Sequence, residues 1–450
     1  MGLILWKRGN RYLSVKIKNE MQMQYKGKGG KLIRKLTVIL VLSAVFGYRM
    51  AIAAEDTLSQ RFEDLERKVE AMQEPFLTMQ GDVENLKKLK LSGYMQVRFD
   101  YADSAKSGLD NEAKNSSISA FGNNFYIRRA RFKVTYEPSP LNSKYVFYFN
   151  FGRSGFPTIL EAYAQLYKKF LPDGSIGADL TFGQFNVPFG YEIEYSSSKR
   201  DFGERSQAEN ALFPGERDRG VNLNFGFSQP TLPFDWKINF ALLQGKGIGT
   251  GSSDWQDFTK AKDMIGRTRF NYKNYYLGFS YYYGQTYVEP VPFSSVWTDT
   301  NQDLVVDSGE VTYTQAKNSD LFDKVRSGVD AQLYFDLLPF GGTALRGEYY
   351  QGFGVGSKDS RFQGYYAWFS QQITTKFGLA YRFDRWDPNA RENAKGDRVD
   401  QHDFVFHYYW DSNTRISFEY VMPKDELDPA LAGDKDRKDN VFRVQTLFVF

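Results

Sequence analysis

The chain has 450 residues, of which 17% are aromatic, 25% are charged and none is cysteine. Its mean hydropathy is negative, which excludes a bundle of membrane-spanning helices, and the lack of cysteine suits an oxidising compartment. The net charge of +4 comes from residues 1–54, which hold eleven Lys/Arg and one acid. The remainder has 58 − 11 = 47 basic and 54 − 1 = 53 acidic residues, a net charge of −6. The positive total therefore gives no indication of a nucleic-acid partner, and we expect none.

A targeting signal is predicted at the N-terminus. Residues 36–46 form an apolar run of eleven residues, too short to span a membrane as a helix. A basic stretch precedes the run, and the small-residue sequence Ala-Ile-Ala-Ala at 51–54 follows it. This order is typical of a secretory signal, so we expect cleavage after Ala53 or Ala54.

Residues 55–89 carry a heptad pattern. Apolar residues recur with alternating spacings of four and three, which predicts a coiled-coil seam in the periplasm. Pro75 lies inside this seam, so we expect a kink there or two shorter helices. A single amphipathic helix lying on the following domain is the alternative. The seam residues are Leu58, Phe62, Leu65, Val69, Met72, Phe76, Met79, Val83 and Leu86.

From residue 90 onward the apolar pattern has a period of two, which is typical of β-strands. The last segment illustrates it: Phe442, Val444 and Phe448 share one face, and Arg443 and Gln445 share the other. Such a strand meets lipid on one side and water on the other. The pattern predicts sixteen strands, at residues 90–101, 124–136, 144–152, 160–168, 176–186, 218–228, 234–244, 262–272, 275–287, 325–337, 342–353, 361–371, 374–385, 400–411, 413–422 and 440–450.

The connections between these strands alternate in length. Those after even-numbered strands are mostly short and rich in turn residues, and those after odd-numbered strands are mostly long and polar. Short turns on one side and long loops on the other, with an even strand count, are typical of an outer-membrane barrel. A soluble β-sandwich, the alternative, has no reason to sort its loops in this way. We therefore predict an all-β fold, a sixteen-stranded antiparallel transmembrane β-barrel over residues 90–450 in outer-membrane lipid.

Four segments in order resemble the phosphate-selective porin O and P family. Residues 125–132 (F-Y-I-R-R-A-R-F) match its Arg-Arg-Ala strand, and residues 160–163 (L-E-A-Y) resemble the strand that follows. Residues 183–190 (G-Q-F-N-V-P-F-G) and residues 204–221, with E-R-S and P-G-E-R-D-R-G-V, resemble the segments around its third loop. Glu161 stands where Asp is usual, and Glu216 is an extra residue. The resemblance implies a homotrimeric porin whose third loop folds inward and narrows the pore.

Basic residues on the predicted inner face are candidates for binding small, phosphate-like anions. Arginine offers several donors to an oxyanion in one planar fork. The alternative is that these side chains only pair with acids across the wall. The third loop holds both signs of charge, which favours mild anion preference over tight phosphate selectivity. The candidates are Arg98, Arg129, Arg131, Lys133, Arg267 and Arg269 on strands, with Lys199, Arg200 and Arg205 in the third loop.

A twelve-residue acidic segment in a long loop has the ligand spacing of a calcium-binding loop. Side-chain oxygens fall at positions 1, 3, 5, 9 and 12, and position 7 offers a backbone carbonyl. Leu304 occupies the position where glycine normally allows the turn. A solvated acidic loop is the alternative to a structural calcium site. The predicted ligands are Asp299, Asn301, Asp303, Val305, Asp307 and Glu310.

Three classes of function follow from these patterns. A porin fits best, either anion-preferring or weakly selective, and a barrel that anchors a periplasmic tether or adhesin is the second. An enzyme is not expected, because the two histidines, His402 and His407, fall on opposite faces of one predicted strand. The sequence shows no nucleophile motif, phosphate-binding loop or Cys/His metal cluster.

Overall fold

The computed structural model describes residues 30–102, 123–139, 142–152, 157–248, 259, 261–298, 311–339, 341–391, 397–426 and 440–450. The chain divides into two compact units, residues 1–84 and 85–450. Each unit is described by itself.

The first unit is built on one long helix, α2 (Gly30–Lys87). The sequence predicts either a kink at Pro75 or two shorter helices. The helix continues through Pro75, so it is not divided into two helices. The apolar side chains of the predicted seam from Phe62 to Leu86 are all exposed in the single chain. Among the described residues, no helix is long and apolar enough to cross a membrane. The helix is therefore confirmed, while its pairing with other copies remains a prediction.

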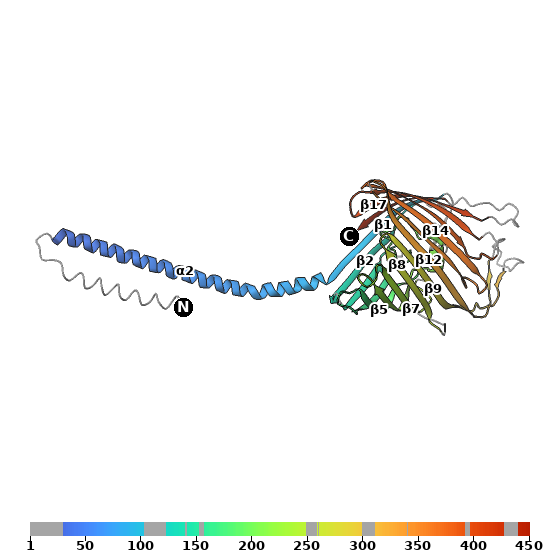
Figure 1. Cartoon of the computed structure of the whole chain (residues 1–450), viewed down its shortest axis with the longest axis horizontal. Helices are drawn as coiled ribbons and strands as arrows, with labels where there is room; N and C mark the ends of the chain where they lie inside the picture. Colours follow the sequence, from blue (N-terminus) through green and yellow to red (C-terminus); the bar gives the residue numbers. More distant parts are fainter. Residues whose placement is uncertain are drawn as a thin grey trace. The chain divides into compact units, whose positions relative to one another are not determined.

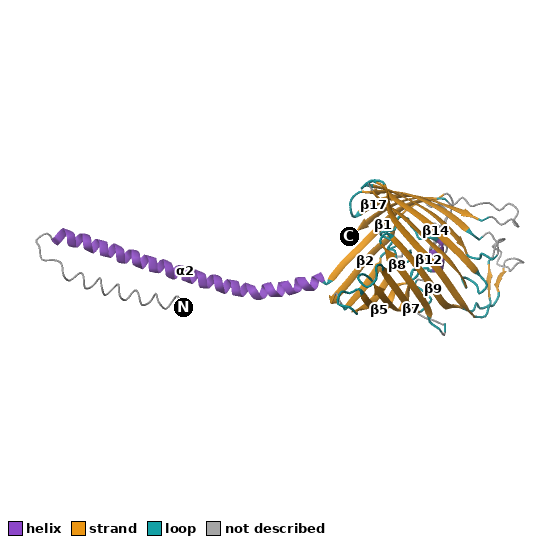
Figure 2. Cartoon of the chain, in the orientation of Figure 1, coloured by secondary structure: helices purple, strands orange, loops and turns teal. Residues whose placement is uncertain are grey.

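The second unit is a closed antiparallel barrel, and within the described residues sixteen strands form it (Figure 1). Each strand pairs with its neighbours in sequence, and the strands run obliquely around the wall (Figure 2). They are β1 (Leu89–Ala102), β2 (Asn123–Ser139), β3 (Ser143–Asn150), β4 (Thr158–Lys169), β5 (Ile176–Asn186), β6 (Arg217–Phe227), β7 (Asp235–Leu243), β8 (Asp263–Tyr272), β9 (Tyr275–Val288), β12 (Asp320–Leu338), β13 (Gly341–Phe353), β14 (Arg361–Gln372), β15 (Phe377–Asp387), β16 (Val399–Tyr409), β17 (Thr414–Asp425) and β18 (Val441–Val449).

All sixteen predicted strands are present in the predicted order, which confirms the fold class of the barrel. Two further short strands, β10 (Ser294–Trp297) and β11 (Val311–Thr314), pair with each other in the long connection before β12. Strand β12 begins at Asp320, five residues before the predicted start at 325. The difference arises because residues 320–324 continue the ladder with β9, although three of the five are charged.

The first and last strands close the barrel. Strand β1 pairs with β18 from Tyr94 opposite Val449 to Ala102 opposite Val441. The backbone N–H of Phe450 donates to the carbonyl of Gly93 at 3.0 Å, and Gly93 N–H donates back at 2.9 Å. A Cβ atom at Gly93 would lie 2.4 Å from the Phe450 ring, so only glycine allows this approach. Closure leaves no open sheet edge in lipid.

Side chains alternate between the two faces of the wall, as the period of two predicts. On β18, Arg443 and Gln445 are 4% and 3% exposed and point inward, whereas Phe442 and Phe448 are each 40% exposed and point outward. An apolar outer face and a polar inner face are the arrangement that lipid outside and water inside require.

Candidate functional site

The third loop, residues 187–216 between β5 and β6, lies inside the barrel. Its backbone contacts inward side chains from widely separated strands. Gln96 of β1 donates to the Ser197 carbonyl at 3.0 Å, and the Gly203 N–H donates to Glu419 of β17 at 3.1 Å. The Gln207 N–H donates to Asp384 of β15 at 2.7 Å. Because β15 lies opposite β5 in the ring of sixteen strands, the loop must cross the lumen and narrow it.

Aromatic packing fixes the loop against strands β13 and β14. Phe189 is fully buried, and its ring lies 5.0 Å from Phe213 and 6.3 Å from Tyr350. Phe202 meets Trp368 edge to face at 5.2 Å. Large buried rings supply most of the apolar contact in such a cluster. The loop is therefore a packed wall of the channel.

A carboxylate cluster adds a second anchor, at the short helix α3 (Gln207–Leu212). Glu348 of β13 accepts the backbone N–H groups of Tyr191 and Glu192, each at 2.6 Å. Tyr350 OH contacts Glu348 and, at 2.6 Å, Glu209 of the helix. Burial, with the neighbouring Glu192 charge, raises the pKa of Glu209 to about 8. A protonated Glu209 lets two carboxyl groups share one hydroxyl without mutual repulsion.

A β-bulge in β2 brings two consecutive arginines into the lumen. In the ladder with β1, Gln96 pairs with Arg129 and Val97 pairs with Ile127, so Arg128 is the extra residue. Arg128 and Arg129 are both buried on the inner side, while Ile127 faces outward. A bulge of this kind redirects one side chain that strict alternation would send outward.

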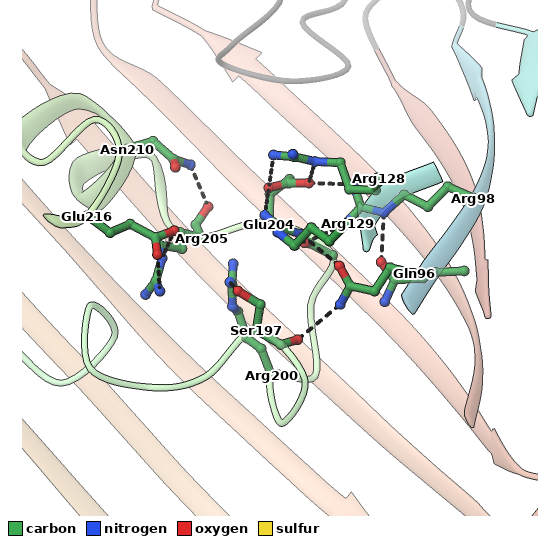
Figure 3. A network of polar contacts seen from close by, with 12 residues as sticks. Gln96, Arg98, Arg128, Arg129, Ser197, Arg200, Glu204, Arg205, Asn210 and Glu216 are labelled. Carbon is green, nitrogen blue, oxygen red and sulfur yellow. Dashed lines mark hydrogen bonds and ion pairs between the residues drawn. The ribbon is translucent and has the colours of Figure 1, made fainter. Parts of the chain in front are cut away.

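Three arginines converge on one carboxylate of the third loop (Figure 3). Arg128 Nε lies 2.8 Å from Glu204 Oε1, Arg129 Nη2 lies 2.9 Å from Oε2, and Arg98 contacts the same group. Burial opposes ionisation of Glu204, but the three guanidiniums outweigh it and hold its pKa well below the usual range. One negative charge against three positive ones leaves this cluster with a surplus charge of +2.

A second group of cations lies beside the first. Arg205 binds Glu216 at 2.6 Å through Nε and 2.9 Å through Nη2. Arg200 lies between this pair and the Glu204 cluster (Figure 3), and its Nη2 donates to the Ser197 hydroxyl at 2.7 Å. In the described part of the chain, Nε and Nη1 of Arg200 are buried without a partner. Burial, together with Arg205 and Arg129, lowers the pKa of Arg200 to about 9.

Arg131 resembles Arg200 in its surroundings. It donates to Tyr94 OH at 2.9 Å, reaches Ser197 Oγ at 3.5 Å, and lies 5.8 Å from the rings of Tyr94 and Tyr148. Neither arginine forms an ion pair with a described carboxylate. The Ser197 hydroxyl thus accepts hydrogen bonds from both Arg131 and Arg200. Neither of these charges is neutralised by direct contact with a described carboxylate.

The other predicted cations are mostly paired with acids. Lys133 lies 3.1 Å from Glu161, and Arg267 and Arg269 share Glu194 at 2.9 and 2.5 Å. All six predicted strand cations point inward, as expected. Lys199 is exposed on the third loop, whereas the neighbouring Arg200 is buried.

Two residues of the site were not among the predicted ones. Strict alternation gives Arg128 the opposite side from Arg129, so the period of two does not indicate its inward position. Two adjacent arginines in an otherwise alternating strand are the signal that could have indicated the bulge. Glu204 belongs to the mixed charges of the third loop, but its three partners lie 75 to 106 residues away in sequence.

The predicted calcium ligands at 299–310 lie outside the described residues. Among the residues that the structure does describe, no group of three or more His, Cys, Asp or Glu is arranged to hold a metal ion. His407 faces inward and contacts Ser417 Oγ at 2.9 Å, whereas His402 packs on the outer side against Tyr381 and Phe383. The two histidines therefore lie on opposite faces, as predicted.

A closed sixteen-stranded barrel, apolar outside and polar inside, with an inward-folded loop, defines an outer-membrane porin. The chain belongs to the phosphate-selective porin O and P family, whose model matches residues 94–450. It is thereby a transport protein and not an enzyme. No curated protein sequence matches the chain.

Solved structures agree on the fold. The outer membrane channel DcaP of Acinetobacter baumannii has a TM-score of 0.52 at 12% identity, over 80% of this chain and 97% of that one. OprB of Pseudomonas putida has a TM-score of 0.52 at 10% identity, over 82% and 96%. At such low identity these likenesses support the barrel fold alone.

Proposed function

We propose that the chain forms a homotrimeric, water-filled channel through which small anions, phosphate among them, diffuse across the outer membrane. Residues 1–54 act as a cleaved signal that directs the chain through the secretory route. The observation that carries the anion preference is the pair Arg131 and Arg200, whose charges meet no described carboxylate in direct contact.

The preference is expected to be mild. Most inward cations are bound to acids of the third loop or of nearby strands, which removes much of their field from the pore. A permeating anion must exchange water for fixed donors without being held tightly. The surplus positive charge around Glu204 and the Arg131–Arg200 pair attracts anions. Because acids lie among these cations, a permeating anion is not held tightly.

Planar-bilayer recording tests this function. Folded protein is expected to give conductance steps in groups of three, and reversal potentials in a KCl gradient are expected to show preference for chloride. Equal permeability of the two ions would favour the second candidate, a weakly selective porin. Well-folded protein without conductance would leave only a barrel that anchors the N-terminal helix.

A further inference from the structure

A separate cavity of about 210 Å³ lies behind the third loop. It is bounded by the end of that loop and by the ends of strands that lead into long connections. Apolar groups form much of the wall, among them Val187, Leu212, Phe213, Pro214 and Val355. Four cationic side chains and two carboxylates also line it: Arg217, Lys246, Lys324, Arg326, Glu216 and Asp218.

Arg326 is the unusual member of this lining. Its guanidinium carbon lies 4.5 Å from the centre of the Phe213 ring and 4.7 Å from that of Tyr282. Tyr282 is its register partner on β9, and its partner on β13 is Gly352, which has no side chain. Within the described residues Arg326 makes no ion pair, and its Nε is buried without a hydrogen-bond partner.

The nearby carboxylates are already occupied. Asp218 accepts the backbone N–H groups of Arg219 and Gly245, each at 2.7 Å. Asp263 is held by Lys324 at 2.8 Å and by Tyr282 OH. Glu216 binds Arg205 and Arg217, each at 2.6 Å. None of these acids is free to turn toward Arg326 without breaking a buried contact, which is costly.

An arginine with its face on aromatic rings still presents the edge of its planar fork. That edge matches a carboxylate, which accepts two parallel N–H donors. Inorganic phosphate is more strongly charged and requires donors on several sides, whereas the three other cations of this lining, Arg217, Lys246 and Lys324, are already paired with acids. The apolar part of the wall instead suits a ligand that carries a hydrocarbon or aromatic body next to its charge.

We propose that this cavity is a second anion site, which binds a small organic carboxylate with an apolar body. Arg326 takes the carboxylate, and Phe213, Pro214 and Val355 pack against the body. The proposal rests on the anion passage proposed above, because the ligand reaches the cavity through the same lumen. It assigns to the channel a class of cargo distinct from inorganic phosphate.

Calorimetric titration of the detergent-folded protein with benzoate is the direct test. Saturable binding is expected for the unmodified chain, with acetate weaker because it lacks the apolar body. Arg326→Met keeps the length of the side chain and removes its charge, and it should weaken benzoate binding at least tenfold. Arg326→Lys keeps the charge but loses the fork, and it should give an intermediate affinity.

Lys358→Met is the matched control. Lys358 is exposed on the connection after β13, so its loss removes one charge near the same end without altering the lining. Benzoate binding by this variant should be unchanged. If Arg326→Met does not fold, Arg326→Lys and Phe213→Leu decide instead, and both should bind benzoate more weakly.

Benzoate affinity that survives the Arg326 substitutions, or that falls equally in Lys358→Met, would overturn the site. If phosphate competes with benzoate more strongly than acetate does, the assignment of the site to carboxylates would be overturned. If the channel prefers chloride in bilayers but does not bind benzoate, only this site is contradicted. If benzoate binds in an Arg326-dependent manner but the channel shows no chloride preference, the proposed function is contradicted and the site is retained.

Discussion

Arg129 Nη2, on the wall, lies 2.9 Å from Glu204 Oε2, on the inward-folded loop. This contact both fixes the loop and cancels part of the charge that a permeating anion would meet. Stability and anion preference are therefore opposed at this point of the channel, and substitutions here should change the two properties in opposite directions.

Replacement of Glu204 by Gln should increase the anion preference. Arg98, Arg128 and Arg129 would lose their shared carboxylate, and chloride reversal potentials should move further toward the anion value. The same change leaves buried guanidiniums facing one another, so the barrel should lose about 3 kcal/mol of stability. Bilayer recording and thermal unfolding measure both effects. Glu137→Gln, which removes a rim partner of Lys90, is the control, and equal selectivity in the two variants would contradict this role.

Removal of Arg131 and Arg200 together should reduce the anion preference without exposing a new acid. The expected fall in the chloride-to-potassium permeability ratio is about fivefold for each charge removed, since one charge near an ion in watery surroundings contributes about 1 kcal/mol. Arg267→Met is the comparison: it leaves Asp330 without its cation and Glu194 with Arg269 alone, and it should add cation preference and lower stability. A double variant with unchanged reversal potential would show that the pair is structural. The same assay on Arg129, Arg131 and Lys133 tests the wall residues as a group.

The third loop should be less firmly anchored at alkaline pH. The pKa of Glu209 is raised to about 8, from an ordinary value of 4.5. Between pH 4.5 and about 8 the folded state therefore keeps a proton on Glu209 that the unfolded state has lost. The free energy of unfolding falls as the pH rises through this range. The slope from this group is about 1.4 kcal/mol per pH unit. Glu209→Gln should remove that slope, as measured by hydrogen exchange of residues 187–216 at pH 6 and pH 9. Equal pH dependence in both proteins would show that Glu209 is not the titrating group.

Disruption of the helical seam should loosen the assembly and spare the barrel. Val69 and Val83 are exposed in the single chain and fall at core positions of the heptad. Their replacement by Lys should lower the temperature at which trimers dissociate on a gel, with unchanged strand content by circular dichroism. Lys68→Glu, outside the seam, is the control. Trimers of unchanged heat resistance would assign the helix another role.

Calcium binding by the loop at 299–310 is expected to be weak, with a dissociation constant of about 10⁻⁴ to 10⁻³ M. Leu304 takes the place of the turn glycine and should reduce affinity. Titration calorimetry of the unmodified chain against Asp299→Ala/Asp303→Ala is the measurement. Identical heats up to millimolar calcium would identify an ordinary acidic surface.

The strands and their inward cations could be predicted because a period of two is a local property of the sequence. The inward position of Arg128 could not be predicted from alternation, since one extra residue in β2 exchanges the inner and outer faces for the residues before it. The partners of Glu204 and Glu194 could not either, because folding brings them together from distant strands. The mixed charge of the third loop was visible in the sequence. That its acids neutralise particular wall arginines became apparent only from the geometry.

The pairing of Gly93 with Phe450 has a consequence for biosynthesis. The two strands that seal the wall are separated by nearly the whole barrel sequence, so no partial chain can complete the cylinder. Every intermediate made before β18 exposes two unpaired strand edges, which are prone to aggregation. Gly93→Ala would obstruct the final closing contact, and its harm should appear mainly as precursor that fails to mature.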